Sequence, residues 1–471
     1  MNSSHFKILV LVAALCPGAS GQSGTPRSAS AQPQAVWAPP VLRAAWSFAR
    51  RLTGGHAKSQ PMVAPLLRDV SRSTLPPQHL LQGGGIPASG DLDGDGDVDL
   101  LMALPGGGVE VWINDGLGRF SDETGLRILH PGHVVSALAI GDIDGDGDAD
   151  VIVGSGASAA GFADRIWINN GAGRFGSWID LPLLGVNTSG IVLGDFNSDG
   201  WVDIVFAVGE GGHSTQGAPD RLFLGDPLGH FTLDQSFAAA QWNESVTAST
   251  SVEAGDVDAD GDLDLFFTKY DALAVGGSPG GQNVLLLNDG NGSFADVSES
   301  HLLPLRRKDN SSDCTLSDLD GDGDLDLVVS NSLLSVSGAL SADVLWNQGG
   351  AQGGTPGYFV DGAGDLPENP IPAESIRLSQ VVADFDGDGL GDILFLVHDL
   401  PPGGQQPLYL GRLGGGFVRA PWFHTSTFVG HAGVAFDADG DGDKELLITA
   451  AGSVAGGFDP YRTRFYRNLT Q

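Results

Sequence analysis

Acidic side chains alternate with small residues in one short stretch of the sequence, Gly141–Gly154, which reads GDIDGDGDADVIVG. Asp142, Asp144, Asp146 and Asp150 stand at positions 1, 3, 5 and 9 of a loop counted from Asp142. Carboxylates this close repel one another unless a cation compensates their charge. Ca²⁺ prefers oxygen ligands in a flexible cage, which suits alternating Asp side chains closed by the backbone carbonyl of position 7. The stretch therefore predicts a calcium-binding loop.

The same loop occurs seven times, and its first residues are separated by 51, 53, 61, 62, 66 and 53 positions. A repeat of this length is typical of a closed array of supersecondary units. We expect up to seven bound Ca²⁺ ions. The predicted side-chain ligands at positions 1, 3, 5 and 9 are Asp91, Asp93, Asp95 and Asp99; Asp142, Asp144, Asp146 and Asp150; Asp195, Asn197, Asp199 and Asp203; Asp256, Asp258, Asp260 and Asp264; Asp318, Asp320, Asp322 and Asp326; Asp384, Asp386, Asp388 and Asp392; and Asp437, Asp439, Asp441 and Glu445.

The acidity of the chain is mainly a property of these loops. The formal net charge is −34, and the loops contain more than half of the 58 acidic residues. Seven Ca²⁺ ions would leave the chain strongly acidic, which argues against nucleic acid as a partner.

The first 21 residues resemble a secretory signal, with Lys7, the apolar run Ile8–Leu15 and the small residues before Gln22. The apolar run is too short to span a bilayer, so we expect a secreted or cell-surface protein without a transmembrane span. An alternative is lipidation of Cys16, although Leu15 stands where a small residue is expected. If Cys16 is removed with the signal, Cys314 is the one cysteine left, and no internal disulfide forms.

Residues 22–62 differ in composition and are rich in Ala, Pro, Ser and Gln. Within them, Val41–Leu52 has the periodicity of a short basic amphipathic helix. Such a helix would contact a membrane surface or the acidic repeat domain, and the alternative is a simple linker.

From residue 63 to residue 471 each repeat has one internal order: an apolar strand, the acidic loop, and three more strands. In the second repeat we expect strands at Val134–Ile140, Val151–Val153 and Arg165–Asn169, and a fourth from Arg174. Four antiparallel strands per repeat predict an all-β, seven-bladed propeller. The last repeat lacks its fourth strand, and Leu67–Ser71 resembles the fourth-strand segment Phe294–Ser298. We therefore expect residues 66–71 to pair with the last blade and close the ring.

These repeats resemble the FG-GAP or VCBS repeat proteins, whose best-known members are the seven-bladed propellers of integrin α chains. The resemblance rests on the G-D-x-D-G-D-G-x-x-D loops, the apolar strands after them, and turns such as VWINDGLGRF at Val111–Phe120. It implies that each loop joins the two innermost strands of a blade and binds Ca²⁺ on the lower face. Loop three departs from the pattern with Asn197 and Trp201, and loop seven ends in Glu445.

Several other sites are excluded by context. EF-hands need Glu at position 12, where these loops have apolar residues such as Met102 and Val153. Gly171–Gly176 fits GxGxxG, but no helix is expected after it, as a dinucleotide site requires. Gly276–Gly280 fits GxSxG without the strand-turn-helix context of a nucleophile elbow.

The expected upper face carries the variable loops, together with Trp178, Trp242, the basic run Arg306–Lys308, and Trp422 near His424. Exposed aromatic and polar groups on a rigid ring suit a protein or glycan ligand, and the alternative is that these tryptophans pack between blades. The sequence thus favours a secreted binding or adhesion module with structural calcium. The alternatives are a lectin or a polysaccharide-active lyase or dehydratase, for which no catalytic constellation is evident in the sequence.

Overall fold

The computed structural model describes residues 67–76, 85–104, 107–128, 134–156, 163–184, 187–209, 218–240, 248–270, 281–302, 310–331, 342–362, 365–367, 377–397, 406–420, 430–450 and 463–469. The signal-like segment, residues 22–62, Trp242, Arg306–Lys308, Trp422 and His424 lie outside these ranges, as does most of each variable upper loop. Among the described helices, none is long and apolar enough to cross a membrane.

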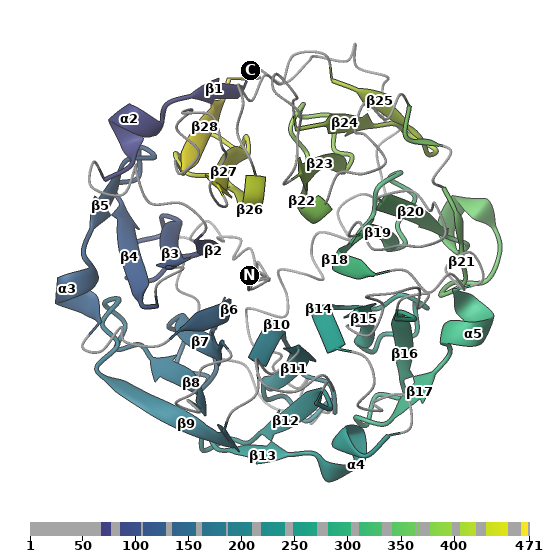
Figure 1. Ribbon diagram of the computed structural model, residues 1–471, viewed down its shortest axis with the longest axis horizontal. Helices are drawn as coiled ribbons and strands as arrows, with labels where there is room; N and C mark the ends of the chain where they lie inside the picture. Colours follow the sequence, from purple (N-terminus) through teal and green to yellow (C-terminus); the bar gives the residue numbers. More distant parts are fainter. Residues whose placement is uncertain are drawn as a thin grey trace, which may run out of the picture.

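Seven four-stranded antiparallel sheets form a ring, so the prediction of a seven-bladed propeller is confirmed (Figure 1). The blades, from the innermost strand outwards, are blade 1, β2 (Ile86–Gly90), β3 (Asp99–Ala103), β4 (Val109–Asn114) and β5 (Phe120–Asp122); blade 2, β6 (Val135–Gly141), β7 (Asp150–Ser155), β8 (Ala163–Ile168) and β9 (Ser177–Leu184); blade 3, β10 (Asn187–Gly194), β11 (Asp203–Gly209), β12 (Arg221–Gly225) and β13 (Phe231–Leu233); blade 4, β14 (Ala248–Gly255), β15 (Asp264–Tyr270), β16 (Val284–Asn288) and β17 (Phe294–Asp296); blade 5, β18 (Ser311–Ser317), β19 (Asp326–Asn331), β20 (Ala342–Asn347) and β21 (Phe359–Asp361); blade 6, β22 (Arg377–Ala383), β23 (Asp392–Val397), β24 (Leu408–Gly411) and β25 (Phe417–Arg419); and blade 7, β26 (Gly430–Phe436), β27 (Glu445–Ala450), β28 (Arg464–Asn468) and β1 (Leu67–Asp69).

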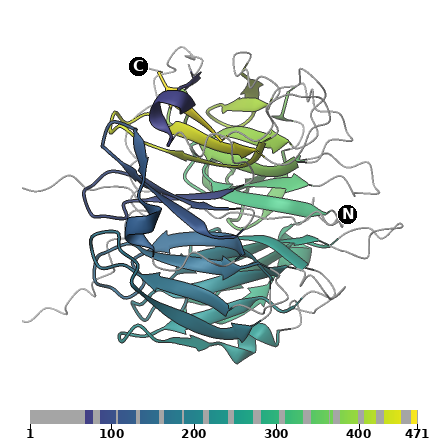
Figure 2. The same ribbon diagram turned by 60° about the vertical axis from the view of Figure 1, so that its left-hand side comes forward.

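Blades 1 to 6 are meanders in which consecutive strands are neighbours, and blade 7 has the same order with β1 as its fourth strand. The first-to-second and third-to-fourth connections therefore lie at the same edge of the sheet, and the second-to-third connection lies at the opposite edge. The acidic loops and the outer hairpin turns consequently share one face of the ring, which we call the loop face. Figure 2 shows the hairpins of blades 1 and 2 gathered on one side of the disc.

The ring is closed by β1, which pairs with β28 in the register Leu67↔Asn468 to Asp69↔Tyr466. The Asp69 carboxylate accepts hydrogen bonds from the backbone N–H and hydroxyl of Ser71, at 3.0 and 2.6 Å, and the Ser71 hydroxyl accepts from Phe465 N–H. Thr124 and Ser298 make the same contacts after the fourth strands of blades 1 and 4. A short helix follows each of these strands, and another follows β13: α2 (Ser71–Thr74), α3 (Thr124–Arg127), α5 (Ser298–His301) and α4 (Gln235–Ala238). The segment Leu67–Ser71 thus makes the contacts that a fourth strand makes in blades 1 and 4.

The hydrophobic core lies between the blades. Each apolar cluster takes residues mainly from two neighbouring blades, as where Phe395 and Tyr409 of blade 6 pack with Val328 and Val344 of blade 5. The second strands are buried because both of their faces contact a neighbouring blade, which explains their continuous apolar sequences. We call each contact surface between two neighbouring blades a seam.

The strand boundaries predicted for the second repeat differ from the structure by one or two residues in β6, β7 and β8, and by three residues at the start of β9. The fourth strand of blade 2 was expected from Arg174 but begins at Ser177. Phe175 is buried and forms an isolated parallel bridge with Ile128, which precedes β6. Phe175 therefore pairs with that segment rather than with β8. Within β9, Trp178 lies opposite Trp167 and is 40% exposed, and the Arg165 guanidinium stacks over its ring at 5.3 Å.

Candidate metal centres

The seven acidic loops connect the first and second strands of the seven blades. Each loop folds back on itself through left-handed residues at positions 4 and 6, such as Gly145 (φ 79°) and Gly147 (φ 97°). Two loops have other residues at position 4, Ser198 (φ 58°) and Ala259 (φ 62°), although side chains disfavour this conformation. The retained positive φ shows that the turn geometry is imposed by the whole loop.

The first carboxylate of each loop is oriented by the backbone. In loop one, Asp91 Oδ1 accepts a hydrogen bond from Gly94 N–H at 2.8 Å and Oδ2 accepts one from Gly96 N–H at 3.1 Å. The position-1 carboxylates of the other loops also accept from two backbone N–H groups, although in loops three and four the donor to Oδ1 is at position 5. Each carboxylate therefore has a defined direction before any ligand binds.

The position-9 carboxylate connects three parts of its blade. Asp99 is fully buried; its Oδ2 accepts from Leu92 N–H in the loop, and its Oδ1 accepts from Asn114 N–H at the end of the third strand. The equivalent bonds occur in every blade, including that of Glu445, whose longer side chain reaches both donors. This second role of position 9 was not predicted, because the spacing within a loop does not reveal the third strand.

Burial without a cation raises the pKa of these inner carboxyls. Desolvation is the main cause, hydrogen bonds from backbone N–H groups oppose it, and neighbouring Asp side chains add to it. The pKa of Asp99 rises to about 7 and that of Asp326 to about 9. Positive charge nearby would lower these pKa values and favour the charged carboxylates.

The geometry of the loops can be tested against a hard cation. In at least five of the loops three carboxylates each offer an oxygen, and these oxygens lie within 4.8 Å of one another, as for Asp91, Asp93 and Asp99. Several loop oxygens are buried without a hydrogen-bond partner, namely Asp93 Oδ1, Asp324 Oδ1 and Oδ2, Asp386 Oδ2, Asp439 Oδ1 and Asp443 Oδ2. Leaving a buried charged oxygen unpaired is costly. The residues therefore fit a cation such as Ca²⁺, which binds carboxylate oxygens at three or more positions.

In five of the blades an asparagine at the end of the third strand joins the loop of its own blade to the loop of the preceding blade. The Asn169 side-chain amide donates to Ala149 O in its own loop at 2.8 Å and to Leu92 O in the loop of blade 1 at 2.7 Å. The same bridge between neighbouring loops is made by Asn114, Asn288, Asn347 and Asn468. The sequence contained the signal, since this Asn recurs in the N-x-G-x-G-x-F turns, but its partner belongs to another blade.

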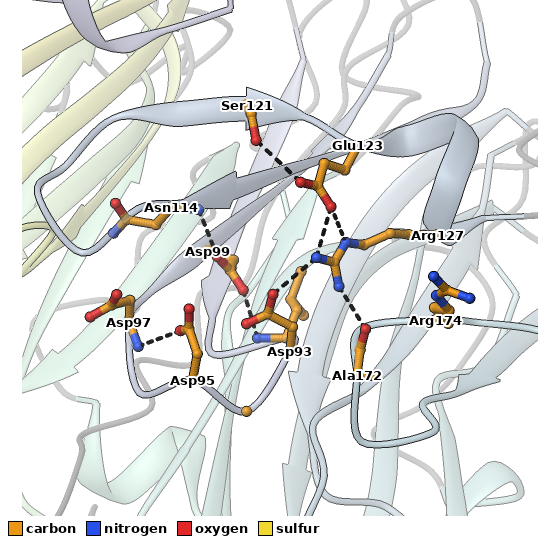
Figure 3. Close-up of polar contacts among 12 residues, drawn as sticks. Asp93, Asp95, Asp97, Asp99, Asn114, Ser121, Glu123, Arg127, Ala172 and Arg174 are labelled. Atoms are coloured by element: carbon orange, nitrogen blue, oxygen red, sulfur yellow. Dashed lines mark hydrogen bonds and ion pairs between the residues drawn. The ribbon is translucent and has the colours of Figure 1, made fainter.

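Arg127 of α3 reaches loop one from the side (Figure 3). Its Nη2 lies 2.9 Å from Asp93 Oδ2, its Nε donates to Glu123 Oε2 at 2.9 Å, and its Nη1 donates to Ala172 O of blade 2 at 2.6 Å. A hollow of about 380 Å³ opens beside these groups, and Leu126 and Arg174 also line it. The hollow thus borders the position-3 carboxylate of loop one.

Sequence comparison matches the FG-GAP-like repeat family at residues 91–153, 195–267 and 269–329. These three stretches are similar to FG-GAP-like repeats. The integrin α resemblance is consistent with this match and with the ring of seven blades. No curated protein matches the sequence.

Two solved structures resemble this chain at low similarity. The crystal structure of BBS1N in complex with ARL6DN, soaked with lead, is 12% identical with a TM-score of 0.46, and the match covers 86% of this chain and 96% of that one. The Dos1 propeller is 11% identical with a TM-score of 0.46, and the match covers 82% of this chain and 78% of that one.

Proposed function

We propose that this protein is a secreted, calcium-stabilised propeller that acts as a binding or adhesion module for an extracellular protein or glycan. Calcium in this proposal is structural: the ions neutralise the seven acidic loops, and no catalytic step depends on them. The supporting observation is the set of buried carboxylate oxygens without partners inside loops whose backbone fixes the carboxylate directions.

The chain's own residues supply the rest of the proposed role. Bound Ca²⁺ would supply the positive charge that the loops lack, with the position-1, -3, -5 and -9 side chains and the position-7 carbonyl as ligands. The position-9 carboxylates then transmit loop order to the third strands, and the asparagines transmit it to the neighbouring blades. A ring held rigid in this way presents its opposite face, including the second-to-third-strand loops, to a ligand.

Calcium binding is tested by measuring the metal content of the full chain after gel filtration in buffer that contains millimolar calcium. We expect several Ca²⁺ ions per chain, not displaced by equal Mg²⁺, because Mg²⁺ demands a smaller octahedral site. Asp386→Asn should lower the calcium content by about one ion per chain, whereas Asp361→Asn on the exposed outer strand β21 should leave it unchanged. A content below one ion per chain would refute the calcium proposal.

The ligand class is tested separately by probing a glycan array and an array of extracellular proteins with the calcium-loaded chain. Binding to either class that is lost in EDTA supports the module proposal. Binding to neither class would contradict it even if the metal content is as expected.

A further inference from the structure

In two of the seven loops an arginine guanidinium pairs with the carboxylate at loop position 3. Arg127 Nη2 lies 2.9 Å from Asp93 Oδ2 in loop one, and Arg467 Nη2 lies 2.7 Å from Asp439 Oδ2 in loop seven. Both carboxylates stand at position 3 of their loops. The two arginines come from different elements, α3 and β28, so the shared contact does not follow from the repeat pattern.

The two arginines also make the same second contact. Arg127 Nη1 donates to Ala172 O in the outer turn of blade 2, and Arg467 Nη2 donates to Leu117 O in the outer turn of blade 1. Each guanidinium therefore connects the acidic loop of one blade to the outer turn of the next. Together they join blades 7, 1 and 2, the part of the ring that contains the closing strand β1.

In both loops the arginine leaves one oxygen of the aspartate free. Asp93 Oδ1 and Asp439 Oδ1 are buried and have no hydrogen-bond partner. In each carboxylate Oδ2 is thus paired with the arginine, while Oδ1 remains available to a cation. Outer contacts of this kind orient metal ligands and tune their charge.

We propose that Arg127 and Arg467 are positioning residues for the cation sites of loops one and seven, where each provides a resident positive charge that partly replaces the ion. This inference rests on the calcium proposal above. Loop five offers a neutral counterpart, because Asp320 Oδ2 accepts there from the side-chain amide of Gln352 at 2.9 Å. Loops one and seven should consequently keep their conformation when calcium is withdrawn.

The proposal predicts a specific coupling between arginine and ion. A guanidinium and Ca²⁺ neutralise the same carboxylate, so the arginine contributes most when the ion is absent. In the full chain, Arg127→Gln should lower the melting temperature by about 2 °C in EDTA and by much less in millimolar calcium. The calcium-induced rise in melting temperature is then larger in the variant than in the wild type.

The matched control is Arg119→Gln, which removes the same charge from the loop face. Arg119 pairs with Asp115 at 4.0 Å, and both side chains are about half exposed or more, so the melting temperature should change little in either buffer. Arg127→Lys keeps the charge and should recover most of the loss in EDTA. Hydrogen exchange of residues 91–103 provides a local readout, and its protection in EDTA should fall in Arg127→Gln alone.

The outcomes separate the two proposals. A wild-type melting temperature that does not respond to calcium refutes the calcium proposal and this one with it. A wild type that responds, combined with equal losses for Arg127→Gln in EDTA and calcium, refutes the arginine proposal alone. If Arg127→Gln does not fold, Arg467→Gln and Arg127→Lys are measured instead. For each variant the loss of melting temperature in EDTA is compared with the loss in calcium, and equal losses refute the arginine proposal.

Discussion

Five of the seven seams are bridged on the loop face by an asparagine, whereas the seams between blades 2 and 3 and between blades 5 and 6 are not. Gly225 and Gly411 stand at the asparagine position in the third strands of blades 3 and 6. The five blades that contribute the bridging asparagine have Asp at loop position 7, whereas blades 3 and 6 have Trp201 and Leu390 there.

These apolar residues take over the contact between loops. A Cβ atom added at Gly145 would lie 3.2 Å from the Trp201 ring, and one added at Gly321 would lie 2.8 Å from the Leu390 side chain. Gly145 and Gly321 belong to the loops of blades 2 and 5. The two seams without asparagine are therefore joined by apolar packing, and the comparison shows that one geometric task has a polar and an apolar solution in the same ring.

The glycines are part of the apolar solution. A Cβ atom at Gly225 would lie 2.2 Å from Val202 O, and one at Gly411 would lie 2.6 Å from Gly391 O. In the polar seams the equivalent carbonyl accepts from the asparagine amide, as Ala149 O does from Asn169. Without that side chain, the third strand comes closer to the loop.

The largest effect is expected from Asn169→Ala in a polar seam. The substitution leaves Leu92 O and Ala149 O without their donor in a buried position, at a cost of about 3 kcal/mol. Denaturant unfolding in calcium measures it. Asn291→Ala on an exposed turn is the control, and an equal small effect for both would show that the bridge contributes nothing.

The next effect concerns the apolar seam between blades 5 and 6. Leu390 is buried, so Leu390→Ala should cost about 2 kcal/mol through lost packing. Leu228→Ala in the outer turn of blade 3 removes an exposed side chain and should change stability by about 0.5 kcal/mol or less. The idea of an apolar seam fails if the two variants unfold at the same denaturant concentration.

The glycine requirement is tested by Gly225→Ala. The added methyl group meets a backbone carbonyl, and we expect a loss of about 1.5 kcal/mol. Gly176→Ala adds the same group where nothing lies within 4 Å, so its denaturation midpoint should stay near that of the wild type. A neutral Gly225→Ala would mean that the strand can move away from the loop at no cost.

The smallest effect should be a gain. Ser198 adopts φ 58° in loop three, and Ser198→Gly should stabilise the chain by about 0.5 kcal/mol, because glycine accepts this conformation without strain. Gly440→Ser at the same position of loop seven makes the reverse change at φ 73°, where nothing lies within 4 Å of the added Cβ, and should destabilise the chain. Both shifts are measured by thermal melting, and a destabilising Ser198→Gly would contradict the strain argument.

The seven blades could be predicted from the sequence because the evidence for them is local. The acidic loop, the apolar strand after it and the Asn-Gly turn each occupy a few consecutive residues, and their repetition gives the number of blades. The similarity of Leu67–Ser71 to Phe294–Ser298 likewise identified a segment that resembles a fourth strand, and β1 lies beside β28. Asp361 and Asp386 illustrate the limit of this approach: their spacing does not show which carboxylate is exposed and which is buried with an unpaired oxygen.

The contacts between blades could not be predicted, because they join residues whose separation along the chain varies. Asn288 and Phe196 are 92 positions apart, and Arg467 and Leu117 are 350 apart. The replacement of Asn by Gly was visible in the weaker turns LFLGDPLGHF and LYLGRLGGGF, but its pairing with Trp201 and Leu390 has a physical meaning only once adjacent loops are in contact.

We have proposed that a cation holds the acidic loops together, and thermal melting of the full chain with and without EDTA is the decisive experiment. We predict a large fall in melting temperature in EDTA that is reversed when calcium is restored, because the buried carboxylates lose their compensating charge. The same melting temperature in EDTA and in millimolar calcium would contradict the account, since the loops would then be stable through their own hydrogen bonds and protonated carboxyls.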